Sequence, residues 1–155
     1  MEKGFVRLKT GDEWTGRNKA NLINEVLGTD FKQHMQSGVP LERVGLPGVV
    51  AWFANLDGKE RGNSDDWRWV DTINDDETEI EERCVSFDKT KYNNKMKRNL
   101  CPSRLVFMLD PHRVGDDYTC RFLGHFQLVE HKREIGYKRF KKTGDEVSIW
   151  DIRGE

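Results

Sequence analysis

Val49-Val50-Ala51-Trp52-Phe53-Ala54 is a continuous apolar run, and the turn-forming string Asn55-Leu56-Asp57-Gly58 follows it directly. An apolar run of this length, closed by a turn signal, predicts a buried β-strand. A second apolar run occupies residues 105–109 after Arg104 and ends at Asp110-Pro111, so it predicts another buried strand. From residue 49 onward the chain is therefore expected to be mainly β.

The remaining periodicity predicts further strands and an N-terminal helix. Phe5–Lys9 has the period-two pattern of a strand, and residues 17–27 place four apolar side chains on one helical face before Gly28. Strands are also expected at residues 67–69, 78–87, 118–130 with a bulge or bend at Gly124, 136–140 and 147–151. Turns are expected at residues 38–40 and 45–48, a second turn or helix at 31–36, and a basic loop or short surface helix at 89–100.

These elements predict a single α+β domain of 155 residues, because the chain has no internal repeat and no linker rich in Pro, Gly or Ser. Residues 1–45 are expected to hold the first strand and helix, and residues 46–155 the β-rich part. The short strands of the β-rich part require a curved mixed sheet or a partly closed β-barrel, flanked by one or two helices.

Composition excludes a membrane protein and favours the cytoplasm. No apolar run approaches the roughly 20 residues of a membrane helix, and residues 1–7 lack the apolar core of a signal peptide. Cys84, Cys101 and Cys120 are odd in number and widely spaced, which is typical of free thiols in a reducing compartment. The cysteines and four histidines form no CxxC or H-x3-H spacing, so neither a metal nor another cofactor is expected.

Charge is segregated along a chain whose net charge is -1. Residues 57–83 contain eleven acids and four bases, whereas residues 89–109 contain six bases and no acid. Residues 131–142 hold six further bases and one acid. Two basic blocks that meet on one face would form a site for a phosphate backbone, although solvated surface explains such runs equally well.

Aromatic residues mark a second candidate feature, because Trp52, Trp67 and Trp69 are interleaved with Asn55 and Asp57. Tryptophan rings stack on a base that is turned out of a duplex, and Asn or Asp can bind its Watson–Crick edge. An acid suits cytosine, whose exocyclic amine is a hydrogen-bond donor. Alternatively, Trp52 is part of the core, and Trp67 and Trp69 cover that core from the edge of a sheet.

Three strings resemble the PUA-like and SRA-like reader domains of bacterial restriction and defence proteins. They are Val49-Val-Ala-Trp52-Phe-Ala-Asn55, Arg104-Leu-Val-Phe107 and Tyr118-Thr-Cys-Arg-Phe122-Leu123-Gly124-His-Phe126, followed by the basic hairpin Lys138-Arg139-Phe140. The resemblance spans residues 49–142. It implies a PUA/SRA-like curved sheet or barrel that recognises a modified base, such as a modified cytosine. The chain has no room for a separate nuclease domain, so we expect a free-standing reader and not an enzyme.

The leading hypothesis is therefore a nucleic-acid-binding module, with DNA favoured over RNA. The expected base pocket consists of Trp52, Asn55, Asp57, Trp67 and Trp69. The expected phosphate contacts are Lys95, Lys97, Arg98, Arg104, Lys138 and Arg139. The oligomeric state is open, and a homodimer is one option.

Two alternatives belong to other classes. Asp110 followed by Glu130-His-Lys132 matches the pattern of small Mg²⁺-dependent nucleases of the PD-(D/E)xK type, in which carboxylates hold the metal and a lysine steadies the attacking water. An exposed strand end explains the same residues. The acidic run of residues 57–82 suggests a phage or defence protein-interaction module, because clustered acids can imitate phosphates.

Overall fold

The computed structural model describes residues 4–31, 38–64, 67–110 and 117–153. In these residues the chain forms eleven strands and two α-helices. The elements are β1 (Phe5–Lys9), β2 (Glu13–Gly16), α1 (Lys19–Leu27), β3 (Gly38–Pro40), β4 (Val50–Ala54), β5 (Asp57–Ser64), β6 (Trp67–Ile73), β7 (Glu79–Phe87), α2 (Lys89–Asn99), β8 (Ser103–Leu109), β9 (Tyr118–Lys132), β10 (Tyr137–Gly144) and β11 (Glu146–Trp150). Single 3-10 turns occupy Glu42–Val44 and Arg133–Ile135.

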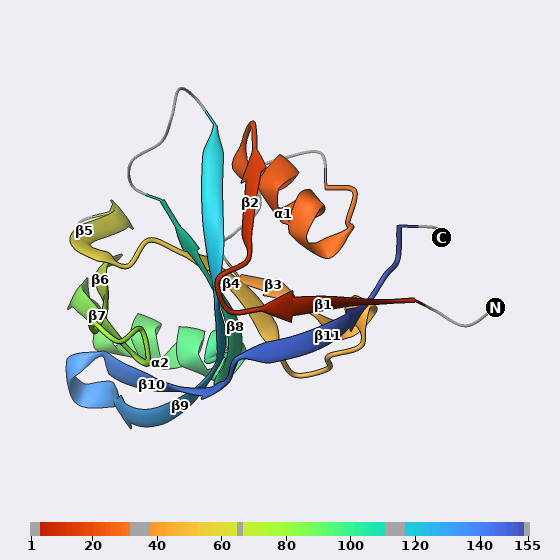
Figure 1. The fold of residues 1–155 in the computed structure, drawn as a ribbon. Coiled ribbons are helices and arrows are strands. Elements are labelled where there is room, and N and C mark those ends of the chain that lie inside the picture. Colours follow the sequence, from red (N-terminus) through yellow and green to blue (C-terminus); the bar gives the residue numbers. More distant parts are fainter. Residues whose placement is uncertain (1–3, 32–37, 65–66, 111–116, 154–155) are drawn as a thin grey trace.

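Nine strands form one mixed sheet in the order β3-β4-β8-β9-β10-β7-β6-β5, and β2 joins it by pairing with β9. Strands β4 and β8 run parallel, whereas the other pairs of this sheet are antiparallel. A second sheet consists of β1 and β11. The large sheet curls, and α1 and α2 lie on opposite sides of its long strand β9 (Figure 1). The expected curved α+β sheet is confirmed.

Strand β4 explains why its sequence is apolar without alternation. Ala51 and Phe53 belong to one buried cluster, and Trp52 and Ala54 belong to another on the opposite face of the strand. Successive side chains of a strand point to opposite faces, so a strand that is covered on both sides needs apolar residues throughout. The ring of Phe53 stacks on that of Phe107 in the neighbouring β8, with 4.7 Å between the ring centroids.

The helices cover the two faces of the sheet. Helix α1 buries Leu22, Ile23, Val26 and Leu27 against the first cluster and ends at Gly28, whose φ of 70° is left-handed, as the sequence predicts. Residues 89–99 form a helix, so the helical alternative for the basic segment is confirmed. Helix α2 buries Tyr92 and Met96, one turn apart, beside Cys84 of β7.

Three strands are missing from the sequence prediction, and each is short or lies at an edge. The expected turn at Gly38–Pro40 is wrong, because this segment is β3, which pairs with β4. The chain does bend at Gly58, whose φ is 75°, but it continues as β5 beyond a register shift. Strand β5 is the last in the sheet and its residues are largely exposed, so no apolar pattern marks it. Strand β2 has only four residues.

The irregularity at Gly124 is confirmed. Its φ is 125°, and the register between β8 and β9 shifts beside it. Residues 32–36 of the second expected helix lie outside the described residues. None of the helices in the described part of the chain has the length and apolar character that crossing a membrane demands.

Candidate functional site

A cavity of about 560 Å³ lies between the curved sheet and α2. Its walls come from β3, β4, β6, β7, β10, α2 and the segment that leads into β8. The lining residues are Gly38, Pro40, Val50, Trp52, Trp69, Glu82, Cys84, Tyr92, Lys95, Met96, Cys101, Arg104, Gly136 and Lys138. A volume of this size is typical of sites that hold small molecules.

Three aromatic side chains contribute to the walls. Trp52 is 7% exposed, and its ring is tilted by 46° against Phe140 with 6.1 Å between the centroids. Trp69 is half-buried on β6. Tyr92 of α2 is buried, and its hydroxyl forms a hydrogen bond of 2.9 Å with Nε2 of His131. The cavity thus offers flat apolar surfaces from both the sheet and the helix.

Two buried cations meet one carboxylate in the same cavity. Arg104 is 6% exposed and Lys138 is 4% exposed. Lys138 Nζ donates to Oε1 of Glu82 at 3.3 Å, and Arg104 Nη1 lies 3.9 Å from Oε2 of the same carboxylate. Burial alone would raise the pKa of Glu82, but the charges of Arg104 and Lys138 outweigh burial and hold that pKa below its ordinary value. Glu82 is therefore ionised.

Asp71 is the direct cross-strand neighbour of Glu82. It is 6% exposed, and its Oδ1 has no hydrogen-bond partner among the described residues. Burial, followed by repulsion from Glu82, raises the pKa of Asp71 far above its ordinary value. The pair therefore consists of a neutral acid that can donate a proton and an ionised acid that accepts hydrogen bonds.

Of the five residues expected to form the pocket, Trp52 and Trp69 line the cavity. Asn55 lies in the connection between β4 and β5 and does not line it. Asp57 instead accepts two hydrogen bonds from the guanidinium of Arg61, at 2.6 and 2.8 Å. Trp67 belongs to β6, and its side chain lies outside the described residues.

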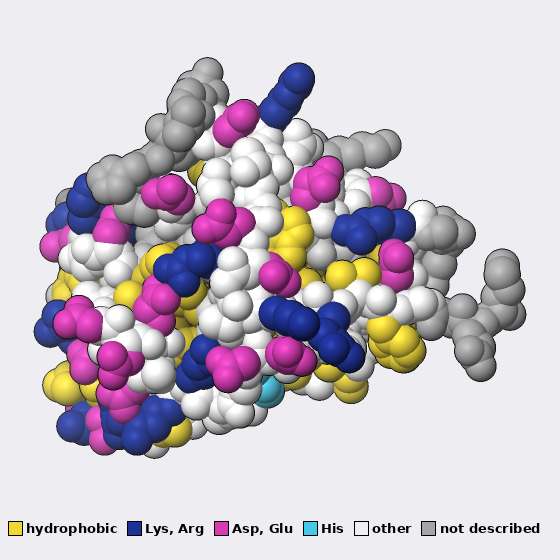
Figure 2. Space-filling model, in the orientation of Figure 1, with side chains coloured by type: hydrophobic (Ala, Val, Ile, Leu, Met, Phe, Trp, Pro, Cys, Tyr) yellow, Lys and Arg dark blue, Asp and Glu magenta, His cyan; other side chains and the backbone are white. Residues whose placement is uncertain are grey.

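The six expected phosphate contacts do not form one surface. Lys95 and Lys97 are exposed on α2, and Lys95 also lines the cavity. Arg104 and Lys138 are buried with Glu82, so they have a partner inside the protein and no place on a basic surface. Arg139 is half-buried and forms an ion pair with Glu79, while the side chain of Arg98 lies outside the described residues. Acidic and basic side chains are interspersed on the face shown in Figure 2.

The expected nuclease residues lie far apart. Asp110 N donates to Thr119 O at the beginning of β9, whereas Glu130 lies near the other end of that strand. A strand rises by about 3.3 Å per residue, so their separation is on the order of 30 Å. One metal ion cannot bridge that distance, and the prediction of a shared metal site is wrong. Among the described residues, no group of three or more His, Cys, Asp or Glu is arranged for a metal.

Part of the acidic run is neutralised by neighbouring bases. Ion pairs join its carboxylates to arginines and lysines of other strands: Glu60 to Arg68, Glu77 to Arg121, Glu79 to Arg139 and Lys141, and Glu82 to Lys138. The carboxylates in these pairs are therefore not free to imitate a phosphate backbone.

Sequence reasoning missed Asp71, Glu82 and Tyr92. The spacing Trp69-x-Asp71 was the available signal, because residues two apart on a strand share a face. In the sequence, the acids of residues 57–83 look like one exposed charged segment. This pattern does not reveal that Asp71 and Glu82 point into the protein.

Comparison with known proteins gives a family and a fold. The model of the family described as the SET and RING associated domain (SRA) matches residues 6–149. None of the curated proteins matches the chain. Among solved structures, the "5-Hydroxymethylcytosine-Specific Restriction Enzyme AbaSI" is similar, with a TM-score of 0.66 and 20% sequence identity. The likeness covers 93% of this chain and 42% of AbaSI, so the chain spans less than half of that enzyme.

Proposed function

The chain belongs to the SET and RING associated (SRA) domain family, and on that premise we propose that it binds DNA and holds a modified cytosine, turned out of the duplex, in the cavity beside α2. The family match confirms the resemblance found in residues 49–142 and extends it to the N-terminal strand. AbaSI, which shares the fold, is named for 5-hydroxymethylcytosine. We propose that this chain binds the same class of base, and we do not propose that it cleaves DNA.

The observation that carries the proposal is the combination of aromatic walls with the half-buried carboxylate of Glu82 in one cavity. Trp52 and Trp69 supply surfaces on which a base can stack, and stacking contributes about 1–3 kcal/mol per base. A base that leaves the duplex loses its pairing partner, so its polar edge needs replacement partners within the protein.

Glu82 and its neighbours supply those partners. The ionised carboxylate of Glu82 accepts from the exocyclic amine of cytosine, whereas thymine presents a carbonyl oxygen at the same position and is repelled. Lys138 also lines the cavity and is a donor, which suits the acceptor atoms of the cytosine ring, while the neutral Asp71 donates toward Glu82 from behind. The site thus favours cytosine on electrostatic grounds, and the room left in a cavity of about 560 Å³ accommodates a substituent on the ring.

Helix α2 supplies the phosphate contacts in this proposal. It carries Lys89, Lys91, Lys95 and Lys97 with no acid, and Lys95 lies at the cavity wall. A base held in the cavity leaves its own backbone at the cavity mouth, within reach of the exposed lysines of the helix. Each phosphate neutralised on a duplex adds about 0.9 to the slope of log affinity against log salt.

The test is a fluorescence-polarisation titration with short duplexes that differ at one position, which holds cytosine, 5-methylcytosine or 5-hydroxymethylcytosine. We expect tighter binding to a modified duplex. Trp69→Ala should weaken that binding by about ten- to a hundredfold, because it removes one stacking surface, and should leave binding to the unmodified duplex unchanged. Trp69→Phe, which keeps a ring, is the matched control and should retain most of the preference. Equal losses on all duplexes in Trp69→Ala would exclude the cavity as the base site.

A further inference from the structure

Arg104 lines the cavity and contacts residues from several of its walls. Its Nε donates to the carbonyl of Cys101 at 2.8 Å and its Nη2 donates to the carbonyl of Leu100 at 3.2 Å. Both carbonyls follow the last turn of α2, where a helix leaves backbone acceptors without intrahelical partners. Arg104 therefore ties the end of α2 to strand β8.

The same guanidinium contacts two aromatic rings of the sheet, which pack against each other with 6.1 Å between their centroids. Its central carbon is 4.5 Å from the centroid of Trp52 on β4 and 4.3 Å from that of Phe140 on β10. A cation beside two rings is attracted to both, so it stabilises their packing against each other. Its Nη1 also faces Glu82 on β7. One side chain thus fixes the positions of the helix, the aromatic wall and the carboxylate relative to each other.

We propose that Arg104 is a positioning residue for base recognition, which holds Trp52, Glu82 and α2 at the spacing that a base requires, and that it is not a phosphate contact. This inference rests on the function proposed above. Lysine cannot substitute, because its single ammonium group cannot donate to both carbonyls while it also contacts both rings. A positive charge at residue 104 is therefore not sufficient to hold Trp52, Glu82 and α2 at this spacing.

Arg104→Lys tests this directly, since it keeps the charge and removes the planar fork. We expect the preference for the modified over the unmodified duplex to fall by at least about tenfold, the range set by buried hydrogen bonds to charged groups. Affinity for the unmodified duplex should fall less than affinity for the modified duplex, because the lysines of α2 are kept. A phosphate contact predicts a different pattern, in which Lys serves as well as Arg and the preference is kept.

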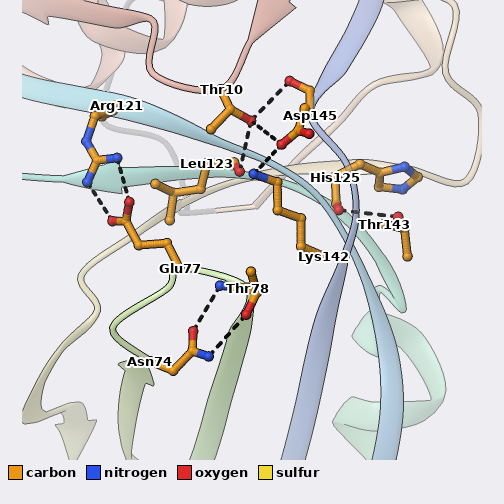
Figure 3. A network of polar contacts seen from close by, with 10 residues as sticks. All are labelled: Thr10, Asn74, Glu77, Thr78, Arg121, Leu123, His125, Lys142, Thr143 and Asp145. Atoms are coloured by element: carbon orange, nitrogen blue, oxygen red, sulfur yellow. Dashed lines mark hydrogen bonds and ion pairs between the residues drawn. The ribbon is translucent and has the colours of Figure 1, made fainter.

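Arg121→Lys is the matched control. Arg121 forms a two-pronged ion pair with Glu77 at 2.8 and 2.6 Å, away from the cavity (Figure 3). The substitution breaks an equivalent fork, so it should lower stability while leaving the preference for the modified duplex intact. This separates loss of cavity geometry from general weakening of the fold.

Phe140→Leu covers the case in which Arg104→Lys does not fold. It removes one of the two rings around the guanidinium and keeps all charges, and we expect a severalfold loss of preference. Full preference in folded Arg104→Lys, or in Phe140→Leu if only that variant folds, overturns the role of Arg104. No preference in the wild-type protein instead overturns the proposed function, and the inference about Arg104 falls with it.

Discussion

Asp71→Asn and Glu82→Gln are nearly isosteric changes at neighbouring positions, yet the structure predicts losses of stability of very different size. Asp71 is neutral, because burial raises its pKa, and Asn is neutral and still donates a hydrogen bond toward Glu82. Glu82 is ionised, and its loss leaves Arg104 and Lys138 buried without a counter-charge. Removing one partner of a buried ion pair costs about 3–5 kcal/mol, whereas Asp71→Asn should cost about 1 kcal/mol or less.

Urea unfolding at several pH values measures both effects. Unfolded Asp71 loses its proton near pH 4, whereas folded Asp71 keeps it above pH 7. The folded protein then holds one more proton than the unfolded chain, so stability falls as the pH rises. The slope is about 1.4 kcal/mol per pH unit, or about 2 kcal/mol between pH 7 and 8.5.

In Asp71→Asn this contribution to the slope should vanish. The lowered pKa of Glu82 acts in a different window, below about pH 4.3, so it does not interfere. Burial lowers the pKa values of His125 and His131, so both are neutral in the folded and the unfolded protein above pH 7. The thiols are common to the wild-type protein and the variant, so their contribution cancels in the difference. Parallel pH profiles of the wild-type protein and Asp71→Asn, or a larger loss in Asp71→Asn than in Glu82→Gln, would refute the assigned proton.

Two further predictions concern the fold and the basic helix. Gly124→Ala should lower the free energy of unfolding by about 2–4 kcal/mol in urea titration, because the new Cβ would lie 2.5 Å from the carbonyl oxygen of Gly144 at a φ of 125°. Gly48→Ala, also at positive φ but in open space, should cost only about 1 kcal/mol, and a similar loss at both sites would show that contact at Gly124 is unimportant. Lys97→Met should weaken binding to modified and unmodified duplexes equally and reduce the salt slope by about 0.9, as polarisation titrations at several salt concentrations will show. A changed preference would place Lys97 at the base instead.

The local pattern of the sequence was sufficient to predict the helices and strands that bury an apolar face. Strands β4 and β8 and helix α1 were predicted because packing on the core requires apolar residues at fixed spacing. Strand β5 was not predicted, since an edge strand with exposed side chains needs no such pattern. What defines it is pairing with β6, which is a property of the folded chain.

The cavity was predictable only in its aromatic part. Trp52 and Trp69 were found because tryptophans among acids are conspicuous in a sequence. The charged part depends on long-range pairing: Glu82 meets Asp71 across a hairpin, Arg104 from β8 and Lys138 from β10. Acids and bases look like solvated surface until the sheet brings them together, so Arg104 and Lys138 were expected to contact phosphates.

The composition of the cavity supports a polar ligand independently of the family. Apolar residues of similar volume often stabilise a fold as well as a buried ion pair does, so the stability of this fold does not by itself require charges here. This chain nevertheless keeps Arg104, Lys138 and Asp71 at 4–6% exposure and leaves Oδ1 of Asp71 without a partner among the described residues. An unpartnered buried oxygen costs about 1–3 kcal/mol, which an apolar residue at position 71 would avoid. A cytosine edge carries both a donor and acceptors, which is what a carboxylate beside a neutral acid and a lysine can bind.

Occupancy should therefore stabilise the fold, and a modified duplex that raises the melting temperature of the wild-type protein more than that of Glu82→Gln would connect the charged cluster to the base.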